Sequence, residues 1–323
     1  MAVSYNPTDY LYLGARLRAK EASLVGKEDL ARYASMKDAA EITAALVAEG
    51  KFPAGTPREQ ALLAMLAQGF DTVREGAPDP GIFAFLQYPY DAHNVKTVLK
   101  CYFARRCADA LLLDVGTVPV KELMQIPTSI PEALPTHLRE AVSHAREVYE
   151  KTGDPREIDF ILDAACFADM AEAAKALPAA EKLVRARAEM TNLRTARRVL
   201  AMGAGVQGEQ ILAHAFLEGG VSDKQELLDA FCEGREALDA LIAKTEFAKA
   251  FESDDPAVID REIDNLYVQI AREVARVPFG AEVAVGYLVG VEYAVKNLRI
   301  LLVAKETGAD AAALGGRLRE NYV

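Results

Sequence analysis

The sequence predicts an all-α protein built from three similar helical units, and three observations support this prediction. Of its 323 residues, 51% are apolar, Trp is absent, and the helix-forming residues Ala, Leu, Glu, Lys and Arg dominate. An asparagine–aliphatic–basic tripeptide occurs three times, and the gaps between its asparagines are 98 and 105 residues. A nearly fixed period of this kind indicates one structural unit used repeatedly. The three copies are Asn94-Val95-Lys96, Asn192-Leu193-Arg194 and Asn297-Leu298-Arg299.

Other landmarks share this register. Gly203 and Gly308 each lie eleven residues after a repeat asparagine, where a glycine in the left-handed conformation commonly ends a helix, and Arg105 holds that place in the first copy. A Lys-to-Leu motif also recurs, as Lys27-Glu28-Asp29-Leu30, Lys121-Glu122-Leu123 and Lys224-Gln225-Glu226-Leu227. We therefore expect a leading segment over 1–23, units over 24–113, 114–217 and 218–308, and a tail over 309–323.

Apolar periodicity and turn residues predict the individual helices. The proline-rich stretch 116–135 and the glycine-rich stretch 203–208 are expected to be irregular or loop segments. The expected helical segments are 9–22, 28–34, 38–49, 57–75, a helix capped by Asp91, several helices within 137–201, and 223–249, 256–276 and 281–306.

Composition excludes several functional classes. The net charge of −11 argues against nucleic acid or an anionic membrane as the main partner, because phosphate binding requires a basic surface. No stretch approaches the roughly 20 apolar residues of a membrane span, so no membrane insertion is expected. The first residues lack the pattern of a secretory signal. We expect reduced thiols and a cytoplasmic location, because the four cysteines show no CxxC spacing: Cys101, Cys107, Cys166 and Cys232.

The sharpest enzymatic signal is the literal GxGxxG pattern of Gly203–Gly208. In a dinucleotide site this pattern follows a buried strand and places pyrophosphate at a helix N-terminus. The repeat register instead places 199–202 at the end of the Asn192 helix, which favours a helix end and a loop. No P-loop, nucleophile elbow or zinc-type spacing is present, so we expect no catalytic, cofactor or metal site, and the four histidines are scattered.

The repeats also contain carboxylates at helical spacing. Asp159 with Asp163, and Asp260 with Asp264, are i,i+4 pairs on one helix face. One hypothesis is that ion pairs within each unit, Asp163 with Arg194 and Asp264 with Arg299, orient two helices. The alternative is that these groups line a shared surface around a pseudo-threefold axis. The candidate structural or interface residues are Asn94, Lys96, Asn192, Arg194, Asn297, Arg299, Asp163 and Asp264.

In combination, these motifs resemble a known family. Tyr10-x-Tyr12-x-x-Ala15-Arg16-x-Arg18 and Tyr88-Pro89-Tyr90-Asp91-Ala92-His93-Asn94 are similar to motifs of the C subunit of V/A-type (vacuolar/archaeal-type) ATPases, a family that includes the d subunit of the eukaryotic V-ATPase. Glu189-x-x-Asn192-Leu193-Arg194, Val295-Lys296-Asn297-Leu298-Arg299 and the closing segment 317–323 match its later motifs. The resemblance covers nearly the whole chain. One departure is Ala294, because an acidic residue three before the third asparagine would match the other copies.

The resemblance implies a funnel of three helical units that receives the foot of a rotating central stalk and rests on the membrane proteolipid ring. It implies a non-catalytic adaptor in ATP-linked cation transport, peripheral to the membrane, that carries neither ATP nor protons. Two alternatives stay open: a generic helical scaffold that binds other proteins, and a nucleotide-binding enzyme that uses Gly203–Gly208.

Overall fold

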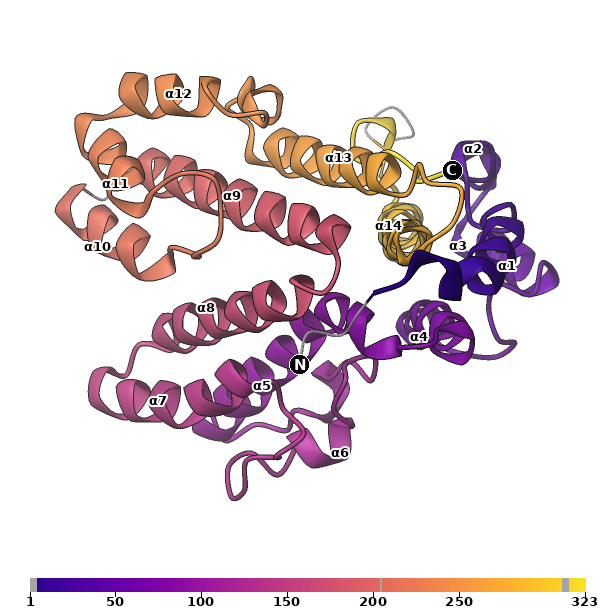
Figure 1. The fold of residues 1–323 in the computed structure, drawn as a ribbon, viewed down its shortest axis with the longest axis horizontal. Coiled ribbons are helices and arrows are strands. Elements are labelled where there is room, and N and C mark those ends of the chain that lie inside the picture. Colours follow the sequence, from indigo (N-terminus) through magenta and orange to yellow (C-terminus); the bar gives the residue numbers. More distant parts are fainter. Residues whose placement is uncertain (1–4, 204, 310–313) are drawn as a thin grey trace. The chain divides into compact units, whose positions relative to one another are not determined.

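A computed structural model describes residues 5–203, 205–309 and 314–323, and in these ranges all regular structure is helical (Figure 1). The α-helices are α1 (Leu11–Glu21), α2 (Lys27–Ser35), α3 (Ala39–Ala48), α4 (Arg58–Gly76), α5 (Tyr88–Phe103), α6 (Val120–Leu123), α7 (Thr136–Thr152), α8 (Pro155–Ala174), α9 (Pro178–Ala201), α10 (Gly205–Ala215), α11 (Lys224–Glu233), α12 (Arg235–Ala243), α13 (Pro256–Val274) and α14 (Ala281–Glu306). Short 3₁₀ helices are η1 (Pro7–Tyr10), η2 (Pro80–Leu86), η3 (Asp109–Leu111) and η4 (Ala248–Phe251).

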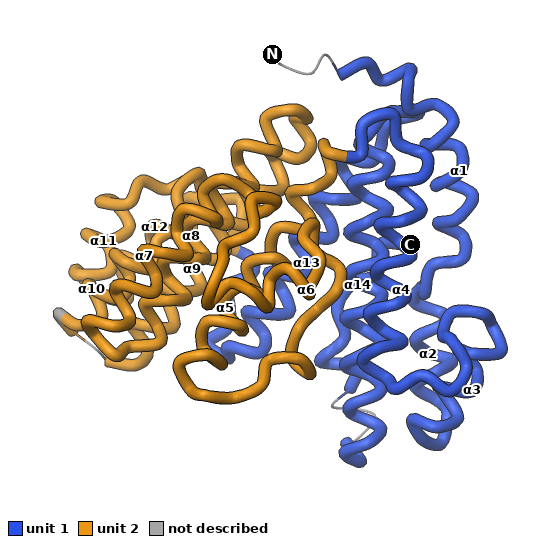
Figure 2. Tube along the Cα trace, turned by 90° about the horizontal axis from the view of Figure 1, so that it is seen from below, with its two compact units in different colours: residues 1–80, 249–323 blue, residues 81–248 orange. Residues whose placement is uncertain are grey.

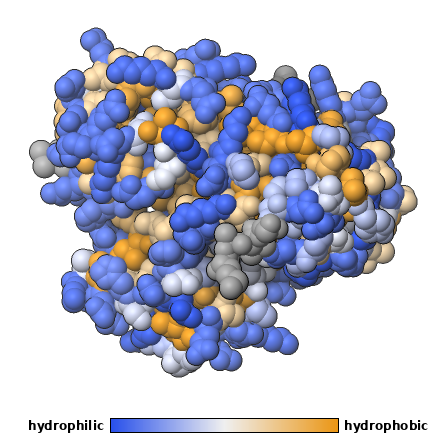
Figure 3. Space-filling view, viewed as in Figure 1, coloured by the Kyte–Doolittle hydropathy of each residue, from blue (hydrophilic) through white to orange (hydrophobic). Residues whose placement is uncertain are grey.

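The chain forms two compact units, which Figure 2 draws in different colours. Unit 1 contains residues 1–80 and 249–323, and unit 2 contains residues 81–248. Among the described residues, no helix combines the length and the apolar character that crossing a membrane requires. The face drawn in Figure 3 is mostly hydrophilic, with smaller apolar areas between the polar ones.

The order of helices recurs along the chain. A helix that begins near the Lys-to-Leu motif is followed by a second helix, then by a third with a proline at its start, then by a fourth that contains the repeat asparagine. The starting prolines are Pro57, Pro155 and Pro256. The recurring sets are α2 to α5, α6 to α9, and α11 to α14, with α1 and α10 as additional helices.

Unit 1 packs around α14, which contacts α1, α2, α3, α4 and α13. Most side chains of this 26-residue helix are buried, as expected of a helix that is apolar on all sides and surrounded by others. Its close approach to α4 requires a glycine. A Cβ added to Gly69 would lie 2.9 Å from Cγ1 of Val291 on α14, closer than real Cβ contacts. A larger residue at this position would force α4 and α14 apart.

Unit 2 packs around α8, which contacts α5, α7, α9 and α10. Asp154 caps the helix by accepting from the Arg156 amide, and Pro155 supplies a favourable first residue. Ile158, Leu162, Cys166 and Met170 are all buried, and their spacing of four residues forms one apolar stripe. Burial of each such side chain stabilises the fold by roughly 1.5–3 kcal/mol.

Several predicted boundaries are confirmed and others are wrong. The prediction of a helix over 281–306 matches α14, and 28–34, 38–49, 57–75 and 256–276 match α2, α3, α4 and α13 within two residues. The predicted loop over 203–208 is wrong, because α10 begins at Gly205 (Ala204 lies outside the described residues). The predicted helix over 223–249 is divided at Gly234, whose φ of 106° interrupts the helix.

The helix ends have the predicted conformation at the two glycines. Gly203 and Gly308 have φ values of 66° and 68°, so both adopt the predicted left-handed conformation. Arg105, at the same distance from Asn94, has a φ of 51° and is the one non-glycine residue with positive φ in the described ranges. The following residues make equivalent bonds: the Arg106 amide donates to Cys101 O at 2.8 Å, and the Ala309 amide donates to Ala304 O at 2.9 Å. The first repeat thus keeps the helix end although it lacks the glycine.

We expect Arg105→Gly to stabilise the protein by up to about 1 kcal/mol. A residue with a Cβ pays a steric cost in the left-handed backbone conformation, and glycine does not. Urea unfolding would measure the change. The matched control is Arg106→Gly, which should lower stability by roughly 0.5–1 kcal/mol through backbone entropy alone. Equal losses in both variants would contradict the assignment of strain to Arg105.

Candidate functional site

The three repeat asparagines perform the same structural task. Each is fully buried, and each uses its side-chain amide to bind the backbone of one residue further along the chain. Asn94 donates from Nδ2 to Leu113 O and accepts from the Leu113 amide, both at 2.8 Å. Asn192 makes the same two bonds to Leu217, both at 2.8 Å. We call each such pair of bonds an asparagine clamp.

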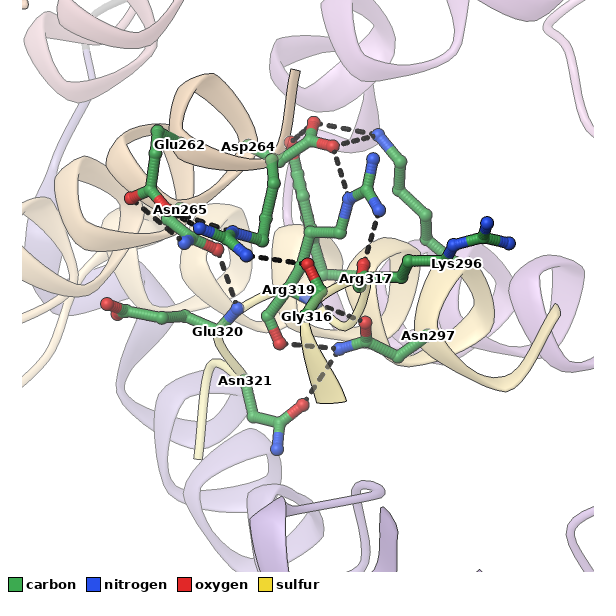
Figure 4. Close-up of polar contacts among 12 residues, drawn as sticks. Glu262, Asp264, Asn265, Lys296, Asn297, Gly316, Arg317, Arg319, Glu320 and Asn321 are labelled. Carbon is green, nitrogen blue, oxygen red and sulfur yellow. Dashed lines mark hydrogen bonds and ion pairs between the residues drawn. The ribbon is translucent and has the colours of Figure 1, made fainter. Parts of the chain in front are cut away.

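The third clamp binds Arg319 in the C-terminal segment (Figure 4). Asn297 donates to Arg319 O at 3.1 Å and accepts from the Arg319 amide at 2.8 Å. Its Nδ2 also donates to Asn321 Oδ1 at 2.9 Å. A carboxamide presents one donor and one acceptor in the geometry of a peptide group, so it satisfies both backbone groups of the clamped residue at once. The clamps therefore attach a returning segment to each asparagine helix.

Two of the clamps have an acidic companion three residues before the asparagine. Asp91 accepts from the amides of Thr117 and Val118 at 3.0 and 3.1 Å. Burial raises the pKa of Asp91, and the hydrogen bonds from Thr117 and Val118 only partly offset this effect. Asp91 lies in the first turn of α5 and bonds to residues outside that helix, so the prediction that it caps the helix is wrong.

Glu189 has the equivalent role on α9. Its carboxylate accepts from the amides of Val221 and Ser222 at 2.7 and 2.9 Å. A glycine three residues after each clamped leucine makes room for the acid. A Cβ added at Gly116 would overlap a carboxylate oxygen of Asp91. A Cβ added at Gly220 would lie 2.6 Å from a carboxylate oxygen of Glu189. Acid and glycine thus form a complementary pair in the first two repeats.

The basic residues of the repeats pair with different partners from those predicted. Lys96 Nζ lies 2.6 Å from Asp163 Oδ1, and Lys100 Nζ lies 2.5 Å from Asp159 Oδ1. These pairs join α5 to α8 within unit 2. Asp163 is therefore paired with Lys96, and the predicted pair of Asp163 with Arg194, which lies on α9, is wrong.

The second predicted pair, Asp264 with Arg299, is also wrong. Arg299 Nε lies 2.9 Å from Glu59 Oε2, which joins α14 to the start of α4 within unit 1. Both corrections have one physical reason: the asparagine helix packs beside the third helix of another set, α5 on α8 and α14 on α4, so its basic residues face carboxylates on that neighbour.

Asp264 instead connects α13, α14 and the C-terminal segment (Figure 4). Its carboxylate accepts from Tyr293 Oη at 2.9 Å, from Lys296 Nζ at 2.7 Å and from Arg319 Nε at 2.9 Å. Burial alone would raise the pKa of Asp264, but Lys296, Arg319 and Tyr293 together hold it below its usual value. The buried carboxylate is therefore charged and fully engaged.

Sequence reasoning found the asparagines but missed the residues that they bind. Leu113, Leu217 and Arg319 lie 19, 25 and 22 residues after their asparagines, so a search at fixed spacing does not find them. The signal that was present is the glycine three residues after each clamped leucine, at Gly116 and Gly220.

The GxGxxG pattern has a helical context. Residues 178–201 form α9, and no strand occurs in the described ranges, so the buried strand that a dinucleotide site requires does not precede Gly203. Within the described part of the chain, no group of three or more His, Cys, Asp or Glu side chains is placed to hold a metal ion. The described site is thus a set of structural attachments in a helical protein with recurring helix order.

Comparison with known proteins gives the family. The model of the ATP synthase (C/AC39) subunit family matches residues 13–315. The C subunit of the V-type sodium ATPase of Enterococcus hirae is 22% identical over 329 residues, which cover 97% of this chain and 99% of that protein. The chain belongs to the ATP synthase (C/AC39) subunit family. Membership confirms the resemblance seen in the sequence motifs and supports a role as a subunit of a rotary ATPase.

We expect Asn192→Ala to destabilise the protein by about 2–4 kcal/mol, because it leaves both backbone groups of the buried Leu217 without partners. Chemical denaturation would measure the loss. Asn6→Ala is the control, since Asn6 is an exposed cap on a short 3₁₀ helix and its loss should cost at most about 1 kcal/mol. Similar losses of stability in the two variants would show that the clamp stabilises the protein no more than an exposed cap does.

We expect Asp264→Asn to reduce stability by about 2–4 kcal/mol at neutral pH, because it leaves Lys296 and Arg319 without their carboxylate. A carboxyl whose pKa is lowered in the folded state stabilises the fold above its unfolded pKa, and this contribution is lost as the pH falls through the folded pKa. The difference between wild type and variant should therefore shrink in acid. Urea unfolding from neutral pH to about pH 3 tests this, and a constant difference would refute it.

Proposed function

We propose that this chain is the rotor adaptor of a V/A-type rotary ATPase. In this role it joins the central stalk to the membrane proteolipid ring and transmits torque between them during ATP-linked cation transport. The single observation that carries the proposal is the family match over residues 13–315, nearly the full length of the chain. The protein would act without catalysis, on the cytoplasmic side, and would contact the membrane only through the ring.

The proposal includes a three-unit body. We propose that 24–113, 114–217 and 218–308 are homologous units around a pseudo-threefold axis that form a funnel for the stalk. The recurring order of four helices supports this arrangement, as do the three asparagine clamps and the three left-handed residues at the same distance from them. An adaptor under torque needs a body that does not deform, and densely packed helices with satisfied buried polar groups provide one.

A reconstitution experiment tests the adaptor role. We expect the purified protein, mixed with isolated central stalk and with detergent-solubilised proteolipid ring, to elute with both in one complex from a sizing column. The control is the same mixture without the protein, in which stalk and ring should elute separately. A protein that binds neither component at low salt is not the adaptor, and this result would favour the generic scaffold.

A further inference from the structure

The C-terminal residues 314–323, which we call the strap, lie along unit 1 and are held by side chains of α13 and α14 (Figure 4). Arg261 donates to Gly316 O at 2.6 Å, Asn265 accepts from the Glu320 amide at 2.7 Å, and Arg272 donates to Tyr322 O at 3.0 Å. These bonds are in addition to the Asn297 clamp. The strap contributes both backbone and side-chain groups, and the helices contribute the side chains that bind them.

In the third copy, the strap takes the place that a covalent connection to the next repeat takes in the first two copies. After the clamped Leu113 the chain reaches the start of α6 in seven residues, and after the clamped Leu217 it reaches the start of α11 in seven residues. After the clamped Arg319 the chain extends to Val323, which lies against Gly26. A Cβ at Gly26 would be 3.7 Å from Val323 Cγ2, an ordinary contact distance. Gly26 directly precedes α2, the helix that begins with the first Lys-to-Leu motif.

In the third copy, the large and the small side chain have exchanged places between the asparagine helix and the segment that it holds. The first two copies have an acid on the helix and a glycine three residues after the clamped residue. In the third copy the helix has Ala294 and the glycines Gly286 and Gly290, and the strap has Tyr322 at the position of the linker glycine. Tyr322 fills the space: a Cβ at Gly290 would lie 2.8 Å from its Cδ1. The large and small groups have changed sides, so complementarity is retained.

We infer that unit 1 contains a binding groove for an extended peptide, and that its ligand is the chain's own strap, which replaces a third connection between repeats. The groove has a notch for an aromatic residue at Gly286 and Gly290. It has basic and amide groups for an acidic residue, since Arg272 and Gln269 bind Glu320 at 3.0 and 2.9 Å. It has the carboxylate of Asp264 for an arginine.

The strap fastens helices from opposite ends of the sequence. Tyr322 Oη donates to Glu21 on α1 at 3.1 Å, and Val323 touches the start of α2, while the remaining bonds come from α13 and α14. A cavity of about 810 Å³ borders the strap between α2 and α13, so the strap is accessible from this side. We expect the strap to leave without unfolding the helices that hold it. The inference uses only the order of repeats and the contacts of the strap within this chain, and it holds whether or not the protein joins a stalk to a ring.

Gly290→Ala in the full-length protein tests the inference. Alanine favours the helical state of α14, but its Cβ displaces Tyr322, so the strap should be released while α14 stays folded. We expect hydrogen exchange of the Arg319 and Glu320 amides to become at least roughly tenfold faster. The amides of Leu113 and Leu217, which are clamped in unit 2, should not change and serve as internal controls.

Tyr322→Ala is the second variant, because it loosens the strap without a clash. Combining it with Gly290→Ala should raise the exchange rates little beyond those of Tyr322→Ala alone, since the ring is gone and only the Cβ of residue 322, 3.0 Å from the added methyl group, remains beside Gly290. Added synthetic peptide of sequence 317–323 should bind the Tyr322→Ala protein and not the wild type. The inference is overturned if strap exchange is unchanged in both single variants, or if exchange rises equally throughout α13 and α14, which would make the strap part of the core.

Discussion

The structure depends on the burial of peptide groups that lie outside helices. A returning segment that packs against a helix brings its own N–H and C=O groups into the core, where each must find a partner. At Leu113, Leu217 and Arg319 a single asparagine side chain supplies both partners. Each clamp fixes the position of the segment along the asparagine helix, and after Leu113 and Leu217 the next helix of the chain starts from that fixed point. The first two asparagines thus determine where the following sets of helices begin.

The charged residues have a different task from the asparagines. The clamps act within one set of helices, whereas two of the ion pairs, Lys96 with Asp163 and Arg299 with Glu59, join an asparagine helix to the third helix of another set. This difference explains why the compact units do not follow the sequence repeats. Helix α5 packs with α8 in unit 2, and α14 packs with α4 in unit 1, so each unit combines helices from different sets.

Much of the fold was predictable because it depends on local signals. Apolar periodicity predicted α14 from Ala281 to Glu306, and the glycine rule predicted the left-handed residues at Gly203 and Gly308. The missed features depend on tertiary contacts. The clamped residues lie at variable distance from their asparagines, the ion-pair partners are chosen by helix packing, and α10 begins within a glycine-rich stretch that by itself favours a loop.

The clamps have a chemical property that the ion pairs lack. A carboxamide is neutral, so it neither gains or loses a proton over the ordinary pH range nor collects counter-ions from the solution. Salt and acid weaken exposed charge pairs such as Arg299 with Glu59, but they leave the asparagine attachments in place. A protein organised around neutral amides therefore keeps its internal geometry over a wider range of acidity and ionic strength than one organised around exposed charge pairs.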